Sequence, residues 1–169
     1  MITDILLLTV FPAAMAFAAA TDLVTFTVPN RISIALLAGF LLLAAMIGLG
    51  WNDIGLHVAA GAGALVLGFV LFACGWIGGG DAKLFAATAL WLGPAALPNY
   101  ALIASVLGGG LTLALIYWRG LPLLPATLNA QSWAVRLHDH KQGVPYGIAL
   151  AAAGLLLYPN SPFMAALGG

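Results

Sequence analysis

Six apolar runs, each near the length that a helix needs to cross a bilayer, make up most of this 169-residue chain. A transmembrane helix takes about 20 largely apolar residues, with a range of roughly 17 to 25. Backbone polar groups must be paired inside hydrocarbon, and the sequence lacks the alternation of a membrane β-barrel, so the runs are predicted to be helices. The predicted spans are 3–21, 32–50, 56–77, 82–97, 99–118 and 144–165. The expected fold is an all-α polytopic membrane protein with about six transmembrane helices.

The composition excludes a soluble domain of this size. Hydrophobic residues form 63% of the chain and charged residues only 6%, whereas globular domains have about 25% charged residues. The formal net charge is zero, which argues against a nucleic-acid partner. Cys74 is the only cysteine, so the chain can form neither an internal disulfide nor a cysteine-rich zinc site. We expect one integral-membrane domain over residues 1–169, in contact with lipid, without a metal or a cofactor.

The positions of the basic residues predict an orientation. Breaker residues mark the joints between spans, namely Pro29-Asn30, Trp51 to Asp53, Gly78 to Gly80, and Pro94 with Pro98-Asn99. With six spans, the first, third and fifth joints share one side. All basic residues fall in or beside these three joints: Arg31, Lys83, Arg119, Arg136 and Lys141. By the positive-inside rule this side is cytoplasmic and both termini are external. The fifth joint, 119–143, is expected to be an amphipathic segment at the membrane surface.

Two aspartates differ from the other acidic residues because each adjoins an apolar helix on the predicted cytoplasmic side. Asp22 follows the first span, and Asp81 precedes the fourth. Carboxyl groups at membrane depth are costly and usually face the protein interior or a wet cavity. Two that lie close together tend to share one proton. The charged member can then take a proton from water while the neutral one hydrogen-bonds a carbonyl, an arrangement that suits peptide hydrolysis.

Other interpretations of these residues are open at this point. Asp81 could cap the start of a helix after a glycine turn, and Asp22 could end a helix at the interface. The pair could also bind ions or protons in a small membrane transporter, or be dispensable in a structural subunit. The glycines at 78–80 could let a substrate backbone approach closely or could serve helix packing.

Three motifs, in this order, resemble those of the type IV prepilin peptidases, a family of intramembrane aspartyl peptidases. Gly78-Gly79-Gly80-Asp81 fits the Gly-x-Gly-Asp signature of that family, and Ala82-Lys83-Leu84 continues it. Asp22 followed by Val28-Pro29-Asn30 is similar to its first catalytic stretch, and Val144-Pro145-Tyr146-Gly147 resembles the motif that opens its last helix. A lone Gly-x-Gly-Asp would be a weak signal, but the three motifs cover most of the chain.

The resemblance implies an aspartic endopeptidase of the bacterial inner membrane. Such an enzyme removes the leader of prepilins or pseudopilins, cutting after a glycine at the cytoplasmic membrane face. Asp22 and Asp81 match the catalytic pair. The positions implied to support the pair or bind substrate are Gly78, Gly80, Lys83, Pro29, Asn30, Pro145, Tyr146 and Gly147.

The chain departs from the larger members of that family. Those members carry an N-terminal cytoplasmic domain with a cysteine-rich zinc site, associated with methylation of the new N-terminus. Here 21 residues precede Asp22, so we expect neither that domain nor methyltransferase activity. The small format resembles the minimal peptidases of tight-adherence (Flp-type) pilus systems, the CpaA or TadV group. The segment Leu23 to Thr27 lacks the basic residues often found after the first aspartate.

Overall fold

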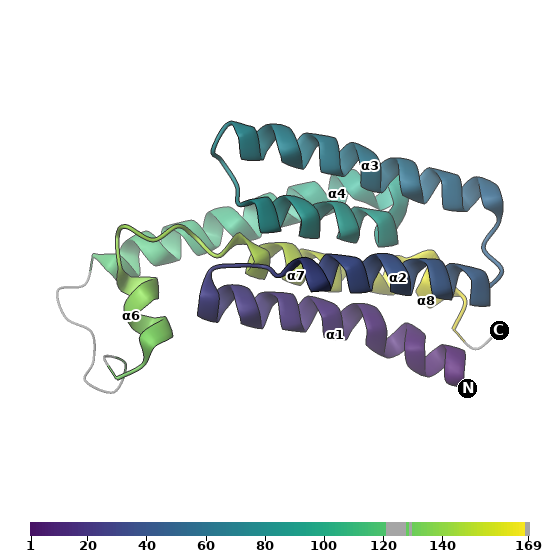
Figure 1. Ribbon diagram of the computed structural model, residues 1–169, viewed down its shortest axis with the longest axis horizontal. Coiled ribbons are helices and arrows are strands. Elements are labelled where there is room, and N and C mark those ends of the chain that lie inside the picture. Colours follow the sequence, from purple (N-terminus) through teal and green to yellow (C-terminus); the bar gives the residue numbers. More distant parts are fainter. Residues whose placement is uncertain (121–127, 129, 168–169) are drawn as a thin grey trace.

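Helices form nearly all of the computed structural model, which describes residues 1–120, 128 and 130–167 (Figure 1). The described residues contain no strand, which confirms the predicted all-α fold. The elements are α1 (Ile2–Thr25), α2 (Asn30–Met46), α3 (Trp51–Ala73), α4 (Gly79–Arg119), α6 (Ser132–His138), α7 (Tyr146–Leu157), the 3-10 helix η1 (Tyr158–Asn160) and α8 (Pro162–Ala165).

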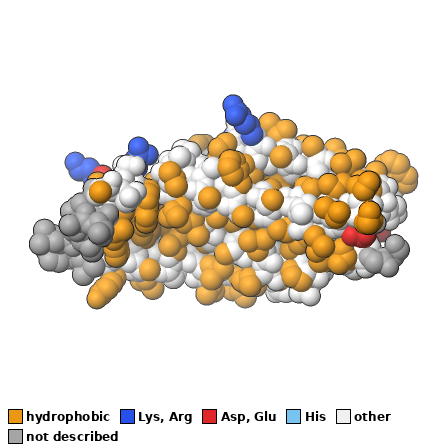
Figure 2. All heavy atoms as spheres, turned by 90° about the horizontal axis from the view of Figure 1, so that it is seen from below, with side chains coloured by type: hydrophobic (Ala, Val, Ile, Leu, Met, Phe, Trp, Pro, Cys, Tyr) orange, Lys and Arg blue, Asp and Glu red, His pale blue; other side chains and the backbone are white. Residues whose placement is uncertain are grey.

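The length and the surface of these helices fit a polytopic membrane protein. Four segments in the described part of the chain are long and apolar enough to cross a bilayer: Ile2–Thr25, Trp51–Ala73, Gly79–Arg119 and Tyr146–Ala165. α2 is apolar but has 17 residues, which is about 26 Å at the rise of an α-helix. Apolar side chains are spread along the whole length of the face shown in Figure 2, and few charged side chains appear on it. The number of crossings and the side on which the termini lie stay predictions.

The fourth joint lies earlier than the sequence predicts. α4 covers both the fourth and the fifth predicted spans, and its backbone leaves the helical conformation at Gly93, with φ 75° and ψ 177°. The chain reverses there, so α4 consists of two arms, 79–92 and 94–119 (Figure 1). Of the breakers that mark the predicted joint, Pro94 directly follows the reversal, and Pro98-Asn99, where the predicted spans meet, is inside the second arm. Glycine tolerates the positive φ, and Pro94 starts a helix readily because its missing N–H is not needed in the first turn.

Other predicted boundaries also shift, and α2 ends at Met46 instead of residue 50 and α3 at Ala73 instead of residue 77. α1 continues to Thr25 instead of ending at residue 21, so Asp22 lies within its last turn. α3 begins at Trp51 instead of residue 56. The last predicted span, 144–165, is divided into α7, η1 and α8. Pro159 and Pro162 account for this division, because proline removes a helical hydrogen bond and is best tolerated at the first position of a new turn.

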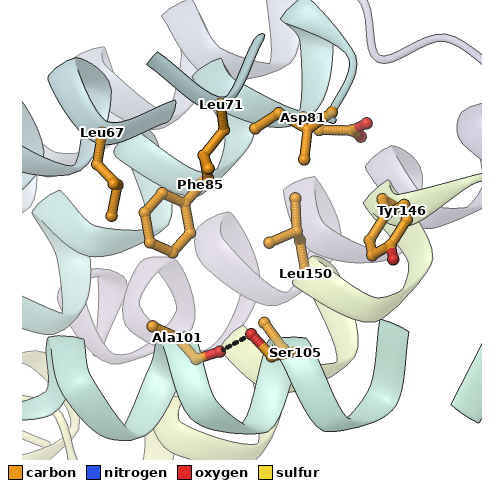
Figure 3. A pocket seen from close by; sticks show the side chains of 10 residues that line it. Leu67, Leu71, Asp81, Phe85, Ala101, Ser105, Tyr146 and Leu150 are labelled. Atoms are coloured by element: carbon orange, nitrogen blue, oxygen red, sulfur yellow. Dashed lines mark hydrogen bonds between the residues drawn. The ribbon is translucent and has the colours of Figure 1, made fainter. Parts of the chain in front are cut away.

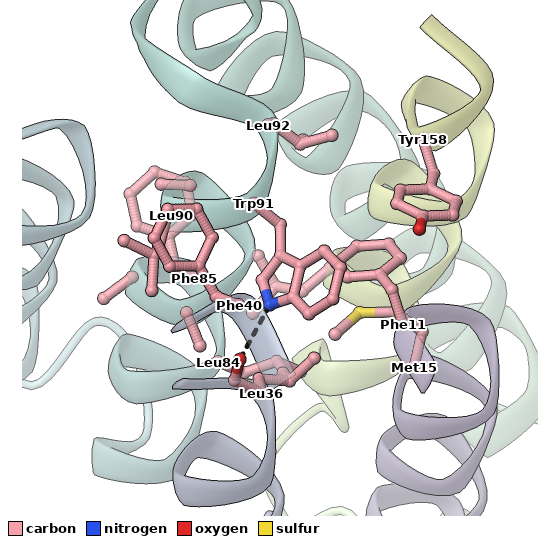
Figure 4. Packing of buried hydrophobic residues seen from close by; sticks show 14 of the residues in the cluster. Phe11, Met15, Leu36, Phe40, Leu84, Phe85, Leu90, Trp91, Leu92 and Tyr158 are labelled. Carbon is pink, nitrogen blue, oxygen red and sulfur yellow. Dashed lines mark hydrogen bonds between the residues drawn. The ribbon is translucent and has the colours of Figure 1, made fainter. Parts of the chain in front are cut away.

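The first arm of α4 lies in the middle of the bundle. Every residue from Leu84 to Gly93 is buried. Trp91 is fully buried and its Nε1–H donates to the backbone oxygen of Leu36 in α2 over 2.9 Å (Figure 4). Its ring packs on Phe11 of α1, with centroids 5.2 Å apart, and on Tyr158 next to α7, at 6.1 Å. This packing holds the end of the first arm against α1, α2 and the segment that follows α7.

The turns that join the helices gather at two ends of the bundle. The turns 26–29 and 74–78 lie at one end, which we call the proximal end, and the N-terminus and α8 lie at the other, the distal end (Figure 1). Of the predicted amphipathic segment 119–143, residues 121–127 and 129 lie outside the described part. Arg119 anchors the rest, because its guanidinium donates to the backbone oxygens of Leu137 and Gly143, each over 2.8 Å.

Candidate active site

The structure brings Asp22 and Asp81 together at the proximal end. Asp22 lies in the last turn of α1 and Asp81 in the first turn of α4. Their carboxyl groups are close enough to interact electrostatically, and the backbone N–H of Gly147, in the first turn of α7, faces both. This N–H donates to Oδ2 of Asp22 over 2.7 Å, and Asp22 is only 3% exposed. Three helix ends thus meet at one pair of carboxyls.

Only one of the two carboxyl oxygens of Asp81 takes part in capping its own helix, α4. Its Oδ2 accepts a hydrogen bond from the Gly78 N–H over 3.2 Å, which caps the start of α4. Its Oδ1 is buried and has no hydrogen-bond partner among the described residues. The interpretation of Asp81 as a helix cap is therefore correct for one oxygen and leaves the other oxygen to be explained.

The turn between α1 and α2 closes over the pair. Phe26 adopts the left-handed conformation, with φ 56°, and its N–H returns to the backbone oxygen of Asp22 over 2.8 Å. Val28 follows and is buried against α4 and α7. A Cβ added at Gly80 would lie 3.1 Å from the Val28 oxygen, and one at Gly147 would lie 3.0 Å from Val28 Cγ2. The two glycines therefore allow the three segments to pack this closely.

The structure also shows where the other predicted supporting residues lie. Lys83 donates to Oδ1 of Asn30 over 2.8 Å on the exposed surface. Pro29 and Pro145 hold the N-cap positions of α2 and α7. Tyr146 packs its ring on Gly108, and its hydroxyl lies 3.4 Å from Oγ1 of Thr112.

Some residues around the site were not predicted from the sequence. Val28 belongs to a recognised motif, but its side chain was not assigned a role. Gly108 belongs to a triple glycine that has no local feature to distinguish it from a helix-packing surface. The contact with Tyr146 is formed between residues 38 positions apart in the sequence and is therefore visible only in the fold.

Two cavities meet at Asp81. The first, which we call the apolar groove, has a volume of about 200 Å³ and is lined by Leu67, Leu71, Phe85, Ala101 and Leu150 among others (Figure 3). The second, which we call the vestibule, has a volume of about 460 Å³ and is lined by residues that include Gly75, Gly78, Thr112 and Gly143. Ile77, Asp81 and Tyr146 line both. Asp22 lines neither of these two cavities.

The site has the groups for acid–base chemistry. Two neighbouring carboxyls next to a cavity can hold a water molecule and exchange a proton with it. Among the described residues, no group of three or more His, Cys, Asp or Glu side chains is placed to hold a metal ion. The fold and the site together define a polytopic membrane protein with a carboxyl pair at one end of its bundle.

Comparison with known proteins gives the family of this chain. The sequence model of the type IV leader peptidase family matches residues 9–113, a range that contains both aspartates and ends before the Val144 motif. The chain belongs to this family, as its motifs predict. The Flp-type subgroup stays a prediction.

Two curated relatives come from Burkholderia pseudomallei, strains 1026b and K96243, and each is named prepilin leader peptidase/N-methyltransferase. Each is 38% identical over 94 residues, which are 55% of this chain and 25% of the relative. The match thus spans a quarter of the length of these relatives. No solved structure matches the chain.

Proposed function

We propose that this protein is an intramembrane aspartic endopeptidase that removes the leader of prepilins or pseudopilins of the Flp type. Asp22 and Asp81 are its catalytic pair, and cleavage follows a glycine at the cytoplasmic face of the bacterial inner membrane. Membership of the type IV leader peptidase family supports the reaction class. The single observation that carries the proposal is the meeting of the two carboxyls beside a cavity that reaches Asp81.

The proposed chemistry uses one proton shared by the pair. The ionised carboxyl takes a proton from water, and the water oxygen forms a bond to the scissile carbonyl carbon. The neutral carboxyl hydrogen-bonds the carbonyl oxygen as it becomes negative. A proton then passes to the amide nitrogen, the C–N bond breaks, and a carboxyl and an amine are released.

The two aspartates are held differently, and we infer that they have different roles in catalysis. Asp22 is buried and fixed by the Gly147 amide. Asp81 lines both cavities and has a free Oδ1, so it is the member that first meets water and substrate. We infer peptidase chemistry for this site and assign no methyl transfer to it.

The placement of basic residues supports the proposed location. Lys83 lies in the first turn of α4 and Arg31 in the first turn of α2, both next to the proximal end. Basic residues favour the cytoplasmic side of a membrane. The carboxyl pair lies at the same end of the bundle, so the same rule puts the active site toward the cytoplasm.

The test is processing of a co-expressed Flp-type prepilin, followed as a gel shift. Asp22→Ala and Asp81→Ala should both abolish processing while the protein still accumulates in the membrane. Asp53→Ala is the matched control, since Asp53 is an exposed aspartate in the first turn of α3 at the distal end. Full processing by either active-site variant would contradict the proposal and would favour a transporter or a structural subunit.

A further inference from the structure

We propose that the apolar groove is the docking surface for the membrane-embedded helix of the substrate and that the vestibule receives the leader. The scissile peptide then lies at Asp81, between the two cavities. This inference rests on the proposed peptidase function and adds the direction in which the substrate lies across the site.

The two cavities differ in the chemistry of their walls. The apolar groove runs between α3, both arms of α4 and α7, and its lining is aliphatic or aromatic apart from Asp81, Tyr146 and Ser105. The Ser105 hydroxyl donates to the backbone oxygen of Ala101 over 2.7 Å, so its hydrogen is already used within its own helix (Figure 3). Such a wall matches the apolar side chains of a transmembrane segment.

The vestibule offers polar groups instead. It is formed by the 74–78 turn, the start of α7 and the second arm of α4. Gly75, Gly78 and Gly143, which have no side chain to cover their backbone, contribute to its lining, and Thr112, whose hydroxyl donates to the Gly108 oxygen over 2.8 Å, adds an oxygen that can accept. Backbone groups exposed in a cavity can pair with an extended peptide, whereas they cannot be left unpaired against lipid. The polar half of a membrane-anchored substrate therefore belongs on this side.

The apolar groove and the vestibule meet at the candidate catalytic residue Asp81. Ile77, Asp81 and Tyr146 line both cavities. The Asp81 carboxyl points away from Leu67 and Phe85, toward the side of the groove where Tyr146 lies (Figure 3). A chain that fills both cavities must pass this carboxyl, whose Oδ1 has no hydrogen-bond partner in the described part of the protein. A polypeptide brings N–H donors to that point, and a lipid tail brings none.

A third cavity provides the internal control. It lies among α2, α3 and the first arm of α4, has a volume of about 300 Å³, and is lined mainly by apolar residues such as Leu37, Ala62 and Leu65, together with Ser33 and Lys83. Asp81 is not part of its lining. It resembles the apolar groove in its mainly apolar lining but not in its relation to the carboxyl pair.

The first experiment fills each cavity with the same extra side-chain volume. Ala101→Leu narrows the apolar groove, and Ala62→Leu narrows the control cavity. Processing of a co-expressed Flp-type prepilin should fall at least about tenfold in Ala101→Leu and stay within about twofold of wild type in Ala62→Leu. Equal effects of the two variants would overturn the inference.

The second experiment reads binding without cleavage. In an Asp22→Asn background, a photoreactive benzoylphenylalanine replaces either Ser105 in the apolar groove or Ala62 in the control cavity. Illumination should attach the co-expressed prepilin at position 105 and not at position 62. Attachment only at position 62, or at neither position, overturns the docking inference. The peptidase proposal would be lost only if the aspartate variants still process the prepilin, so the two failures can be told apart.

Discussion

The backbone N–H of Gly147 donates a hydrogen bond to Oδ2 of Asp22 over 2.7 Å, although 125 residues separate the two in the chain. The contact joins the last turn of α1 to the first turn of α7. Because Asp22 is 3% exposed, little water competes for this bond. A backbone donor moves less than a side chain would, so the orientation of the Asp22 carboxyl depends on how closely α7 can approach α1.

Gly147→Ala tests that dependence. A Cβ at this position would lie 2.8 Å from Oδ2 of Asp22, so that carboxyl must shift, and 3.0 Å from Cγ2 of Val28, which is a tight contact. The expected result is a loss of prepilin processing of about tenfold or more, with normal accumulation of the protein. Gly63→Ala is the control, because a Cβ there meets nothing within 4 Å. Wild-type processing by Gly147→Ala would mean that the Asp22 carboxyl is not held as described.

Gly108→Ala tests the support of Tyr146, which lines both cavities at Asp81. A Cβ at Gly108 would lie 2.5 Å from Cε1 of Tyr146, so the ring must leave its position beside the cavities. We expect processing to fall by about threefold to tenfold. The next residue gives the control, since Gly109→Ala adds a methyl group in open space. Equal processing by the two alanine variants would show that the position of the Tyr146 ring does not matter.

The pairing of Asp22 and Asp81 could be predicted from the sequence because it depends on local patterns. Each aspartate adjoins an apolar run, and joints one and three of a helical membrane protein lie on the same side. The role of Val28 could not be predicted this way, because its neighbours Gly80 and Gly147 come from α4 and α7. Only the packing of three helix ends shows why both positions exclude a side chain.

The fourth joint is the opposite case. The sequence does contain a local signal for it, but the predicted spans meet further along the chain than the observed reversal. Gly93-Pro94 and Pro98-Asn99 both contain helix breakers, and the apolar run continues through the first of them. Gly93 takes the positive φ, while Pro98 is accommodated near the start of the second arm. Which breaker acts is decided by packing, since Gly93 lies against the ring of His57 in α3.

His57 stabilises the chain reversal at Gly93, and substituting it tests what holds the two arms of α4 in place. The first arm of α4 ends at residue 92, so the backbone oxygen of Leu90, in its last turn, has no N–H of a following helical turn to pair with. The Nδ1 of His57 lies 2.7 Å from that oxygen, and since a carbonyl can only accept, Nδ1 is the donor. We expect His57→Leu to lower the free energy of unfolding by about 1–2 kcal/mol.

Thermal unfolding in detergent is the measurement. His57→Asn is the matched variant, because the amide nitrogen of asparagine can occupy a position close to Nδ1. It should retain more of the stability than His57→Leu does. A leucine variant as stable as the asparagine variant would show that the hydrogen bond to Leu90 contributes nothing to the reversal.

Lys83 allows a structural role to be separated from a role in binding. Its Nζ donates to Oδ1 of Asn30 over 2.8 Å, and both side chains are exposed, so the bond links the starts of α4 and α2 at the surface. Lys83→Met should therefore cost no more than about 1 kcal/mol of stability and change processing by less than about threefold. Asn30→Asp keeps the acceptor and adds an opposite charge, so it should be at least as stable as wild type. If Lys83→Met instead abolished processing while its thermal unfolding matched wild type, Lys83 would be a substrate-binding residue and its bond to Asn30 incidental.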